Sequence, residues 1–313
     1  MLASAGWRAL QDYPTRLFDL YPLYYGGIAW LKTGTAYVLD SVVPIGDHSY
    51  LVYQVGNIYP LPAVIVTLPL TLLPPQIAGT LWIALLVGGL IGSLRLYGGS
   101  YWFLLYLPLL EAVRIEQYTA LIVIFQIVAL WAVRERRPWI LALCCAIILT
   151  KPSHGLAFVI AVALLSGHWR RILLVSGLLW GASLAADPSW PVEWASALVQ
   201  DGRFEAGGFM WPIAAFAVPL TIVADVVGAA VVLQFLLLPL FGVYVATSVP
   251  LSLLHDPRIR WLVALSFLWP FPAALLSPAW ATVLTLVLPM VVLSAYIRRD
   301  RLSRFRYRAA ARA

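Results

Sequence analysis

The chain has 313 residues, of which 62% are hydrophobic and 11% are charged, and its mean hydropathy is +0.87. A soluble domain carries about 25% charged residues, so the composition excludes an ordinary soluble protein and indicates an integral membrane protein. The formal net charge of +7 lies mostly in the tail after residue 297, a pattern typical of a cytoplasmic anchor on anionic lipid rather than of a nucleic-acid-binding face.

The stretch RLFDLYPLYYGGIAWLKTGTAY, residues 16–37, precedes the first long apolar run. It combines Asp19 with tyrosines, paired glycines and Lys32, and its polar breaks are too frequent for a membrane span. We expect interfacial helices on the outer leaflet here. A membrane anchor needs no carboxylate, so Asp19 is a candidate general base toward a sugar or lipid hydroxyl. The alternative is a solvated acid at a helix edge.

The apolar runs predict an all-α fold, a polytopic membrane helix bundle with about nine spans. The expected spans are residues 60–75, 76–96, 118–133, 138–150, 152–166, 170–186, 226–247, 259–276 and 279–297. Two further apolar pieces, 101–113 and 209–222, are predicted to be re-entrant or interfacial helices. We expect one transmembrane domain over residues 1–297, with outer segments at 20–56 and 187–208, followed by a basic tail at 298–313.

The arginine clusters predict the orientation of the bundle. Positive charges concentrate on the cytoplasmic side, and nine spans place four clusters there: RERR at 134–137, Arg170–Arg171, Arg258 with Arg260, and the C-terminal tail. The outer face then gathers the acids Asp12, Asp19, Asp40, Asp47, Glu111, Glu116, Asp187, Glu193, Asp201 and Glu205. An active site, if present, is therefore expected to face outward.

Two polar motifs interrupt the first half of the chain. NIYPLPAVIVTLPLTLLPP, from Asn57, places Tyr59 either at the mouth of a cavity or simply at the lipid boundary. LLEAVRIEQYTALI carries Glu111, Arg114, Glu116 and Gln117, and such side chains at membrane depth must pair or line water. Glu111 and Arg114 could form an i,i+3 ion pair. Alternatively, the Arg114 guanidinium could bind a phosphate.

Two further motifs are expected on the outer side. LTKPSHG places Lys151 and His154 at a turn, where Lys151 either extends to lipid headgroups or, together with His154, holds a phosphate. DPSWPVEWASAL predicts an amphipathic outer helix with Trp190 and Trp194 as interface anchors. Carboxylates, an arginine and a lysine on one face are what transfer from a lipid phosphate requires, because a base must deprotonate the acceptor and cations must stabilise the departing phosphate.

The order of these motifs resembles the GT-C superfamily of polyprenyl-phosphate-sugar glycosyltransferases. The chain is most similar to the bacterial polyprenol-phosphate-mannose-dependent mannosyltransferases. The resemblance rests on DLYPLYYGGIAWLKTGTAY, NIYPLPAVIVTLPLTLLPP, RIEQYTALIV, LTKPSHG, DPSWPVEW and LSPAWATVLTLVLP, over residues 19–297. Where the family often has Gly-Gln, this chain has Glu116–Gln117.

The resemblance implies a function and a set of site residues. Asp19 matches the catalytic base, and transfer of a mannose-like hexose from a polyprenyl-phosphate sugar to a lipid or glycan acceptor would be inverting. Arg114 and Lys151 are candidate phosphate contacts, while Tyr59, Gln117 and His154 would line the cavity. The resemblance also implies a bacterial plasma membrane and no cofactor. The arginine-rich tail places the C-terminus in the cytoplasm, and Asp40, Asp47 and His48 could bind a divalent ion.

One departure from the family opens an alternative function. Family members have a spanning helix directly before the catalytic Asp, and the 18 residues before Asp19 form no span. Either the start of the chain is misassigned, or the helix has been lost. A site that has lost the helix would suit a non-catalytic subunit of GT-C origin within a larger membrane complex. A flippase or transporter of lipid-linked sugar is a third hypothesis.

Overall fold

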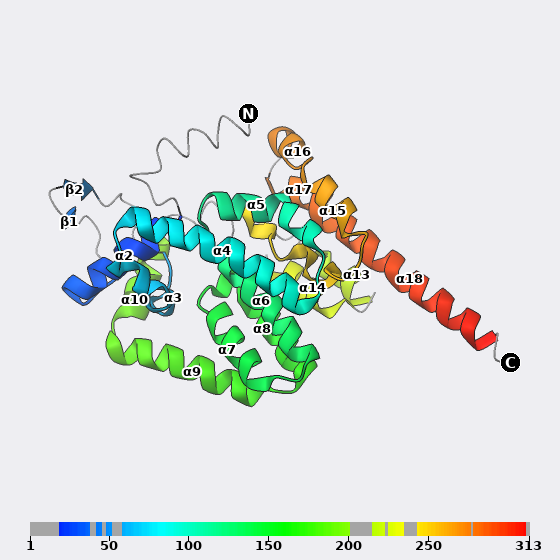
Figure 1. The fold of residues 1–313 in the computed structure, drawn as a ribbon, viewed down its shortest axis with the longest axis horizontal. Coiled ribbons are helices and arrows are strands. Elements are labelled where there is room, and N and C mark those ends of the chain that lie inside the picture. Colours follow the sequence, from blue (N-terminus) through cyan, green and yellow to red (C-terminus); the bar gives the residue numbers. More distant parts are fainter. Residues whose placement is uncertain are drawn as a thin grey trace.

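The computed structural model describes residues 19–37, 42–45, 48–51, 58–200, 215–222, 225–234, 243–276 and 278–310. These residues are mainly helical, as the all-α prediction requires (Figure 1). The exception is a hairpin of β1 (Val42–Ile45) and β2 (His48–Leu51), paired antiparallel with Val43 opposite Tyr50. Its β-branched Val and Ile residues favour an extended backbone. The predicted outer segment 20–56 therefore contains a hairpin in addition to a helix.

Three helical elements form the N-terminal part of the fold. They are α2 (Tyr21–Thr33), α3 (Leu61–Thr67) and the 3-10 helix η1 (Leu68–Leu72), and α2 packs against both others. Gly27 allows the close approach, because a Cβ at this position would lie 2.5 Å from Thr71 Cγ2. Tyr24 adds a hydrogen bond of 2.6 Å from its hydroxyl to the carbonyl oxygen of Leu73.

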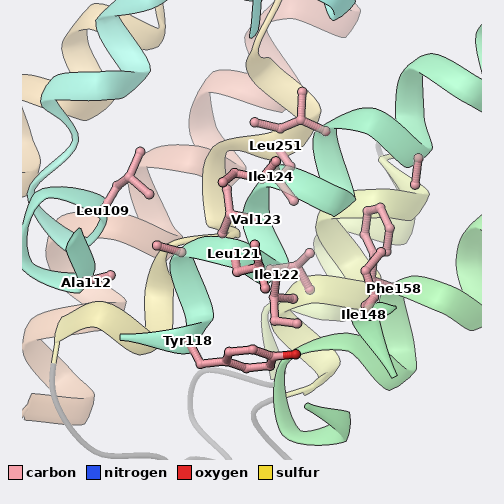
Figure 2. Close-up of a cluster of buried hydrophobic side chains, with 14 of the residues drawn as sticks. Leu109, Ala112, Tyr118, Leu121, Ile122, Val123, Ile124, Ile148, Phe158 and Leu251 are labelled. Carbon is pink, nitrogen blue, oxygen red and sulfur yellow. The ribbon is translucent and has the colours of Figure 1, made fainter. Parts of the chain in front are cut away.

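A central group of five helices is built on α6 and α7. The group comprises α4 (Pro75–Tyr97), α6 (Tyr118–Arg134), α7 (Pro138–Ile148), α8 (Pro152–Ser166) and α9 (Trp169–Ala186). Helix α6 packs against α4, α7 and α8, and the side chains of Ile122 and Val123 are fully buried. Figure 2 shows this core, with Ile148 of α7 and Phe158 of α8 beside the α6 side chains. A helix that is apolar on all sides is buried among its neighbours.

Proline and glycine explain where these helices begin and end. Helices α4, α7 and α8 have Pro in the first turn, where the missing N–H costs no hydrogen bond. Gly98 and Gly167 follow α4 and α8 with φ values of 74° and 70°, the left-handed conformation that glycine adopts most easily. The prolines and glycines visible in the sequence therefore mark the boundaries of these helices.

The remaining elements are mostly short. They are η2 (Tyr101–Leu105), α5 (Leu107–Arg114), α10 (Trp190–Gln200), α13 (Ala217–Ile222), α14 (Val226–Leu233), η4 (Val243–Ala246), η5 (Val249–Leu253), α15 (Ile259–Ser266), α16 (Pro270–Leu275), α17 (Pro278–Thr282), the π-helical η6 (Val283–Val287) and α18 (Leu288–Ala310). Helix α18 extends away from the other helices, and its far end carries the basic tail (Figure 1). The apolar piece 101–113 forms η2 and α5, both too short to span a bilayer.

Several described helices lie at predicted spans, but few of them are long enough to cross a membrane. Two described helices, Pro75–Tyr97 and Trp280–Arg299, are long and apolar enough to cross a membrane. A third span results if Trp169–Ala186 and Trp190–Val199, which meet at a 92° bend, count as one. The other apolar helices have 17 residues or fewer, while a crossing needs about 20. The count of about nine spans is therefore not confirmed.

The surface of the helical body is apolar, as expected for a membrane protein. Leu164, Leu173 and Leu178 are exposed by 77%, 62% and 64% on α8 and α9. Soluble monomers rarely expose large contiguous apolar areas. Together with the composition and the two long apolar helices, these side chains indicate a membrane protein.

Candidate functional site

Asp19 is held to the turn between α5 and α6 by two hydrogen bonds. Its backbone N–H donates to the carbonyl oxygen of Ile115 at 3.0 Å. Its carboxylate oxygen Oδ2 accepts a hydrogen bond of 2.5 Å from Nε2 of Gln117. The start of α2 and the start of α6 therefore meet at the residue predicted to be the base.

Gln117 connects Asp19 to two other predicted site residues. Its side-chain oxygen Oε1 accepts hydrogen bonds from the Tyr59 hydroxyl at 2.9 Å and from Lys151 Nζ at 2.8 Å. An amide has one oxygen and one NH₂ group, so two donors on the oxygen leave the NH₂ group to face Asp19. Four predicted site residues, Asp19, Tyr59, Gln117 and Lys151, thus form one hydrogen-bonded network.

Lys151 lies inside the protein. It is 8% exposed, and Nζ also donates to Thr119 Oγ1 at 2.7 Å. The ammonium lies 5.2 Å from the centre of the Tyr59 ring, a distance at which cation and ring attract each other. A buried charge is tolerated when polar partners surround it. Lys151 is therefore a supporting cation behind Gln117 rather than a side chain extended to lipid headgroups.

A left-handed residue shapes the turn that carries Gln117. Glu116 has φ = 57°, a conformation in which glycine is favoured, and its side chain is buried. The backbone oxygen of Glu116 accepts a hydrogen bond of 2.9 Å from Trp82 Nε1, and the Trp82 ring stacks on Tyr118. The Tyr118 hydroxyl forms a hydrogen bond of 2.8 Å with Thr150 Oγ1. Tyr118 lies at the lower edge of the cluster in Figure 2.

The two other predicted site residues lie beside this network. Arg114, at the end of α5, donates to both carboxylate oxygens of Glu111 at 2.8 and 2.5 Å, so the expected i,i+3 ion pair forms. This hydrogen bonding raises the pKa of Arg114 above its ordinary value. His154, in the first turn of α8, is buried, and its backbone oxygen accepts from Gln126 Nε2 at 3.1 Å.

A second polar group lies at the start of α10. Glu193 accepts a hydrogen bond from the Thr35 hydroxyl. The single Ser189 hydroxyl proton is shared between Asp187 Oδ1 at 2.7 Å and Glu193 Oε1 at 2.9 Å. Nearby, the Tyr37 hydroxyl donates to the backbone oxygen of Tyr59 at 2.9 Å. Burial raises the pKa of Tyr37 well above its usual value, and the negative charges of Asp187 and Glu193 add to the shift.

This second group joins α10 to the Asp19 network. Trp194 Nε1 donates to the backbone oxygen of Ile58 at 3.0 Å, one residue before Tyr59. The predicted anchors of α10 therefore pack inward: Trp190 is only 1% exposed. The interpretation of Trp190 as a lipid-boundary anchor is wrong, because its ring packs between Trp180 and Trp194.

The sequence interpretation missed three contributors to the site. Thr119 binds the Lys151 ammonium, Tyr37 supports Tyr59, and Thr35 binds Glu193. Thr119 could have been suspected, because it lies two residues after Gln117 in the polar run EQYT. Tyr37 and Thr35 carried no such signal, since their partners are distant in sequence.

The suggested divalent-ion site cannot be assembled from the described residues. Asp40 and Asp47 lie outside them, and so do Asp12, Asp201 and Glu205 of the predicted acidic face. Elsewhere in the described ranges, no three His, Cys, Asp or Glu side chains gather in a way that could hold a metal ion.

The chain was compared with known protein families, curated proteins and solved structures. Residues 57–201 match the family model of Glycosyltransferase family 87. The match supports the resemblance to the GT-C superfamily, and it includes Tyr59, Arg114, Gln117, Lys151 and His154. It begins after Asp19, so the proposed base lies outside the matched segment. No curated protein and no solved structure matches.

Proposed function

We propose that the protein is a membrane glycosyltransferase of the GT-C type. In this proposal it transfers a mannose-like hexose from a polyprenyl-phosphate sugar to a lipid or glycan acceptor on the outer face of a bacterial plasma membrane. The observation that carries the proposal is the hydrogen bond from Gln117 to Asp19, because it joins the candidate base to a segment that matches a glycosyltransferase family.

In the proposed reaction, the acceptor hydroxyl attacks the anomeric carbon and its proton passes to Asp19. The new glycosidic bond forms as the bond from the anomeric carbon to the phosphate oxygen breaks, and polyprenyl phosphate leaves with the electron pair. Attack from the face opposite the phosphate inverts the configuration at that carbon. No nucleotide and no redox partner is needed.

The cations would act on the departing phosphate. The half-exposed guanidinium of Arg114 offers a planar pair of donors that matches two phosphate oxygens. Lys151 would act through Gln117, to which it donates a hydrogen bond. Its positive charge would offset the negative charge of the Asp19 carboxylate and stabilise the negative charge that develops on the departing phosphate. Tyr59 and His154 would line the cavity, and Gln117 would orient Asp19.

The test is a transfer assay with the full chain in vesicles. Labelled polyprenyl-phosphate mannose and an acceptor lipid extract are supplied to wild type, Asp19→Asn and Glu135→Gln. Removing a general base slows a reaction by about 10²–10⁴-fold, so Asp19→Asn should lose transfer. Glu135→Gln makes the same carboxylate-to-amide change at an exposed ion pair with Arg134 and should keep it.

The outcomes separate the proposal from its rival. Undiminished transfer by Asp19→Asn would refute the assignment of the base. A folded wild type that transfers no sugar, but purifies in a stable complex with other membrane proteins, would support the non-catalytic subunit instead.

A further inference from the structure

Two turns at one end of the central helices form a basic and aromatic surface. The turn between α6 and α7 carries Arg136 and Arg137, and the start of α9 carries two further arginines. Helices α7 and α9 pack side by side (Figure 1), and the Arg171 guanidinium lies 5.4 Å from the centre of the Trp139 ring, so the two turns are in contact. We call this surface the arginine face, and it consists of Arg136, Arg137, Trp139, Trp169, Arg170 and Arg171.

The positive charges of the arginine face are not balanced by acids. Glu135 is the one acid in the sequence between residues 117 and 186, and it pairs with Arg134 at 3.1 Å. Within the part of the chain that the structure describes, the four arginines of the face form no ion pair. Three of the four are exposed, namely Arg136, Arg137 and Arg170. The face therefore presents a cluster of cations that a ligand can reach.

Neighbouring rings hold two of the arginine side chains in place. Nη1 of Arg171 lies 3.5 Å from Nδ1 of His168, and because a guanidinium can only donate, this ring nitrogen is the acceptor. The Arg170 guanidinium lies 5.3 Å from the centre of the Trp169 ring, a contact of the same kind as that between Arg171 and Trp139. An arginine that is already ordered loses less conformational entropy when it binds an anion.

Arg136 has a backbone conformation in which glycine is usual. Its φ is 53°, and the N–H groups of Arg136 and Arg137 donate to the carbonyls of Val133 and Ala132 at 3.3 and 2.8 Å, which ends α6. Glycine occupies the left-handed position after α4 and α8. In the described ranges the other non-glycine residue with positive φ is Glu116, at the candidate functional site. An arginine kept in a strained conformation points to a role for its side chain.

The surroundings of the arginine face determine the class of ligand. One helical turn further along, α7 and α9 expose the apolar side chains of Leu143, Leu173 and Leu174. Tryptophan is enriched at the boundary between hydrocarbon and headgroups, and the two tryptophans of the face lie between the arginines and these leucines along the helices. A soluble polyanion would contact the cations but not the leucines, whereas an anionic lipid contacts both.

We propose that the arginine face binds the headgroup of an anionic membrane glycerophospholipid. The phosphate oxygens accept hydrogen bonds from the guanidinium groups, which match them in pairs, and the acyl chains lie along the exposed leucines. A zwitterionic lipid binds less tightly, because its own cation is repelled by the four arginines. The site is independent of the proposed transfer reaction, since it lies at the opposite ends of α6 and α7 from Gln117 and Lys151.

The test measures lipid binding to the full chain in detergent micelles by native mass spectrometry. Phosphatidylglycerol and phosphatidylcholine with the same acyl chains are titrated, and the Kd of the first bound lipid is determined. Each arginine near an anionic lipid corresponds to about a fivefold gain in affinity. The wild type should therefore prefer phosphatidylglycerol by at least about 25-fold, and the double change Arg137→Gln with Arg171→Gln should reduce this preference by about 25-fold.

Arg260→Gln with Arg299→Gln is the matched control for the double change. It also removes two arginines, both exposed, from α15 and α18. The Arg260 guanidinium lies 5.5 Å from the centre of the Trp261 ring, so a contact between arginine and tryptophan is lost here too. The Kd of the first phosphatidylglycerol should be unchanged in this control.

Arg136→Gly separates the backbone of this residue from its side chain. Glycine adopts the left-handed conformation without strain, so the midpoint of thermal unfolding should rise, while phosphatidylglycerol binding should weaken by about fivefold. A more stable variant that binds as tightly as the wild type would contradict the role of Arg136.

The remaining outcomes would overturn the proposal. Equal affinity of the wild type for the two lipids is one, and that comparison needs no variant. An equal loss of affinity in the two double variants would mean that the overall charge of the protein attracts the lipid. Displacement of phosphatidylglycerol by glycerol phosphate at equal concentration would assign the face to a soluble phosphate. Displacement by polyprenyl phosphate at a much lower concentration would assign it to a prenyl lipid.

Discussion

Lys151 Nζ donates a 2.8 Å hydrogen bond to Gln117 Oε1, and this contact determines which end of the Gln117 side chain faces Asp19. With Tyr59 also donating to the same oxygen, the NH₂ group is the end that meets the carboxylate. The orientation of Asp19 therefore depends on a lysine that lies on the far side of the amide.

We predict that Gln117→Leu slows transfer by about 10–100-fold, part of the contribution of a positioned base. The change keeps a similar volume but removes the donor to Asp19 and the acceptor of Lys151 and Tyr59. Unfolding free energy should fall by about 1–3 kcal/mol, because a buried ammonium loses a partner. Steady-state transfer and thermal unfolding in detergent measure the two effects.

Gln234→Leu is the matched control for that experiment. Gln234 is also buried, and its Oε1 has no hydrogen-bond partner in the described structure, so the change removes no accepted hydrogen bond and should leave transfer intact. Equal transfer by the two variants would contradict the positioning role of Gln117.

We predict opposite stability effects for two glycine-to-alanine changes. A Cβ at Gly155 would lie 2.3 Å from Ile148 Cγ2 and 2.6 Å from the Ile148 carbonyl oxygen, so Gly155→Ala must push α8 away from α7. Overpacking of this kind costs about 1–3 kcal/mol. It should also displace the turn that carries Lys151 and so reduce transfer.

Gly177→Ala provides the comparison on α9. A Cβ there meets nothing within 4 Å, and alanine is favoured over glycine in a helix by roughly 0.5–1 kcal/mol. Circular dichroism during heating should show a higher midpoint for Gly177→Ala and a lower one for Gly155→Ala. Shifts of the same sign would refute the packing argument.

We predict that Arg114→Gln and Glu111→Gln differ in substrate binding but not in stability. Both changes break one surface ion pair, and such pairs contribute about 0–1 kcal/mol. If Arg114 binds the donor phosphate, only its own replacement should raise the KM for polyprenyl-phosphate sugar. The KM of each variant is measured by titrating the sugar donor. If the two variants have the same KM, Arg114 does not bind the donor phosphate.

We predict that Tyr37→Phe makes unfolding less sensitive to alkaline pH. The pKa of Tyr37 is raised by burial and then by Asp187 and Glu193, so above the ordinary pKa of 10.0 the unfolded chain binds fewer protons than the folded one. Wild-type stability should therefore fall as pH rises above that value, and this residue contributes at most about 1.4 kcal/mol per pH unit. Unfolding of both proteins between neutral pH and pH 11 measures the difference, and identical slopes would contradict it.

The helix positions were largely predictable from sequence. Apolar runs bounded by Pro and Gly located α4, α8 and α9 to within a few residues. The number of crossings was not predictable in this way, because hydropathy shows that a run is apolar but not whether one straight helix contains all of it. The expected span at 259–276, for example, is divided between α15 and α16.

The site was only partly predictable. Individual polar residues were evident because they interrupt apolar runs, and five of them lie in the segment that matches the family model. Their partners were not evident, since Asp19 and Gln117 are 98 residues apart. The turn at Glu116 is instructive: its φ of 57° is a conformation that favours glycine, yet this chain has a buried glutamate there.

The backbone hydrogen bond from Asp19 to Ile115 has an evolutionary consequence. It joins main-chain atoms alone, so either side chain can be exchanged without removing it, and natural selection on it leaves no preferred amino acid at position 115. A proposed base anchored in this way can stay in place while the residues around it diverge beyond recognition.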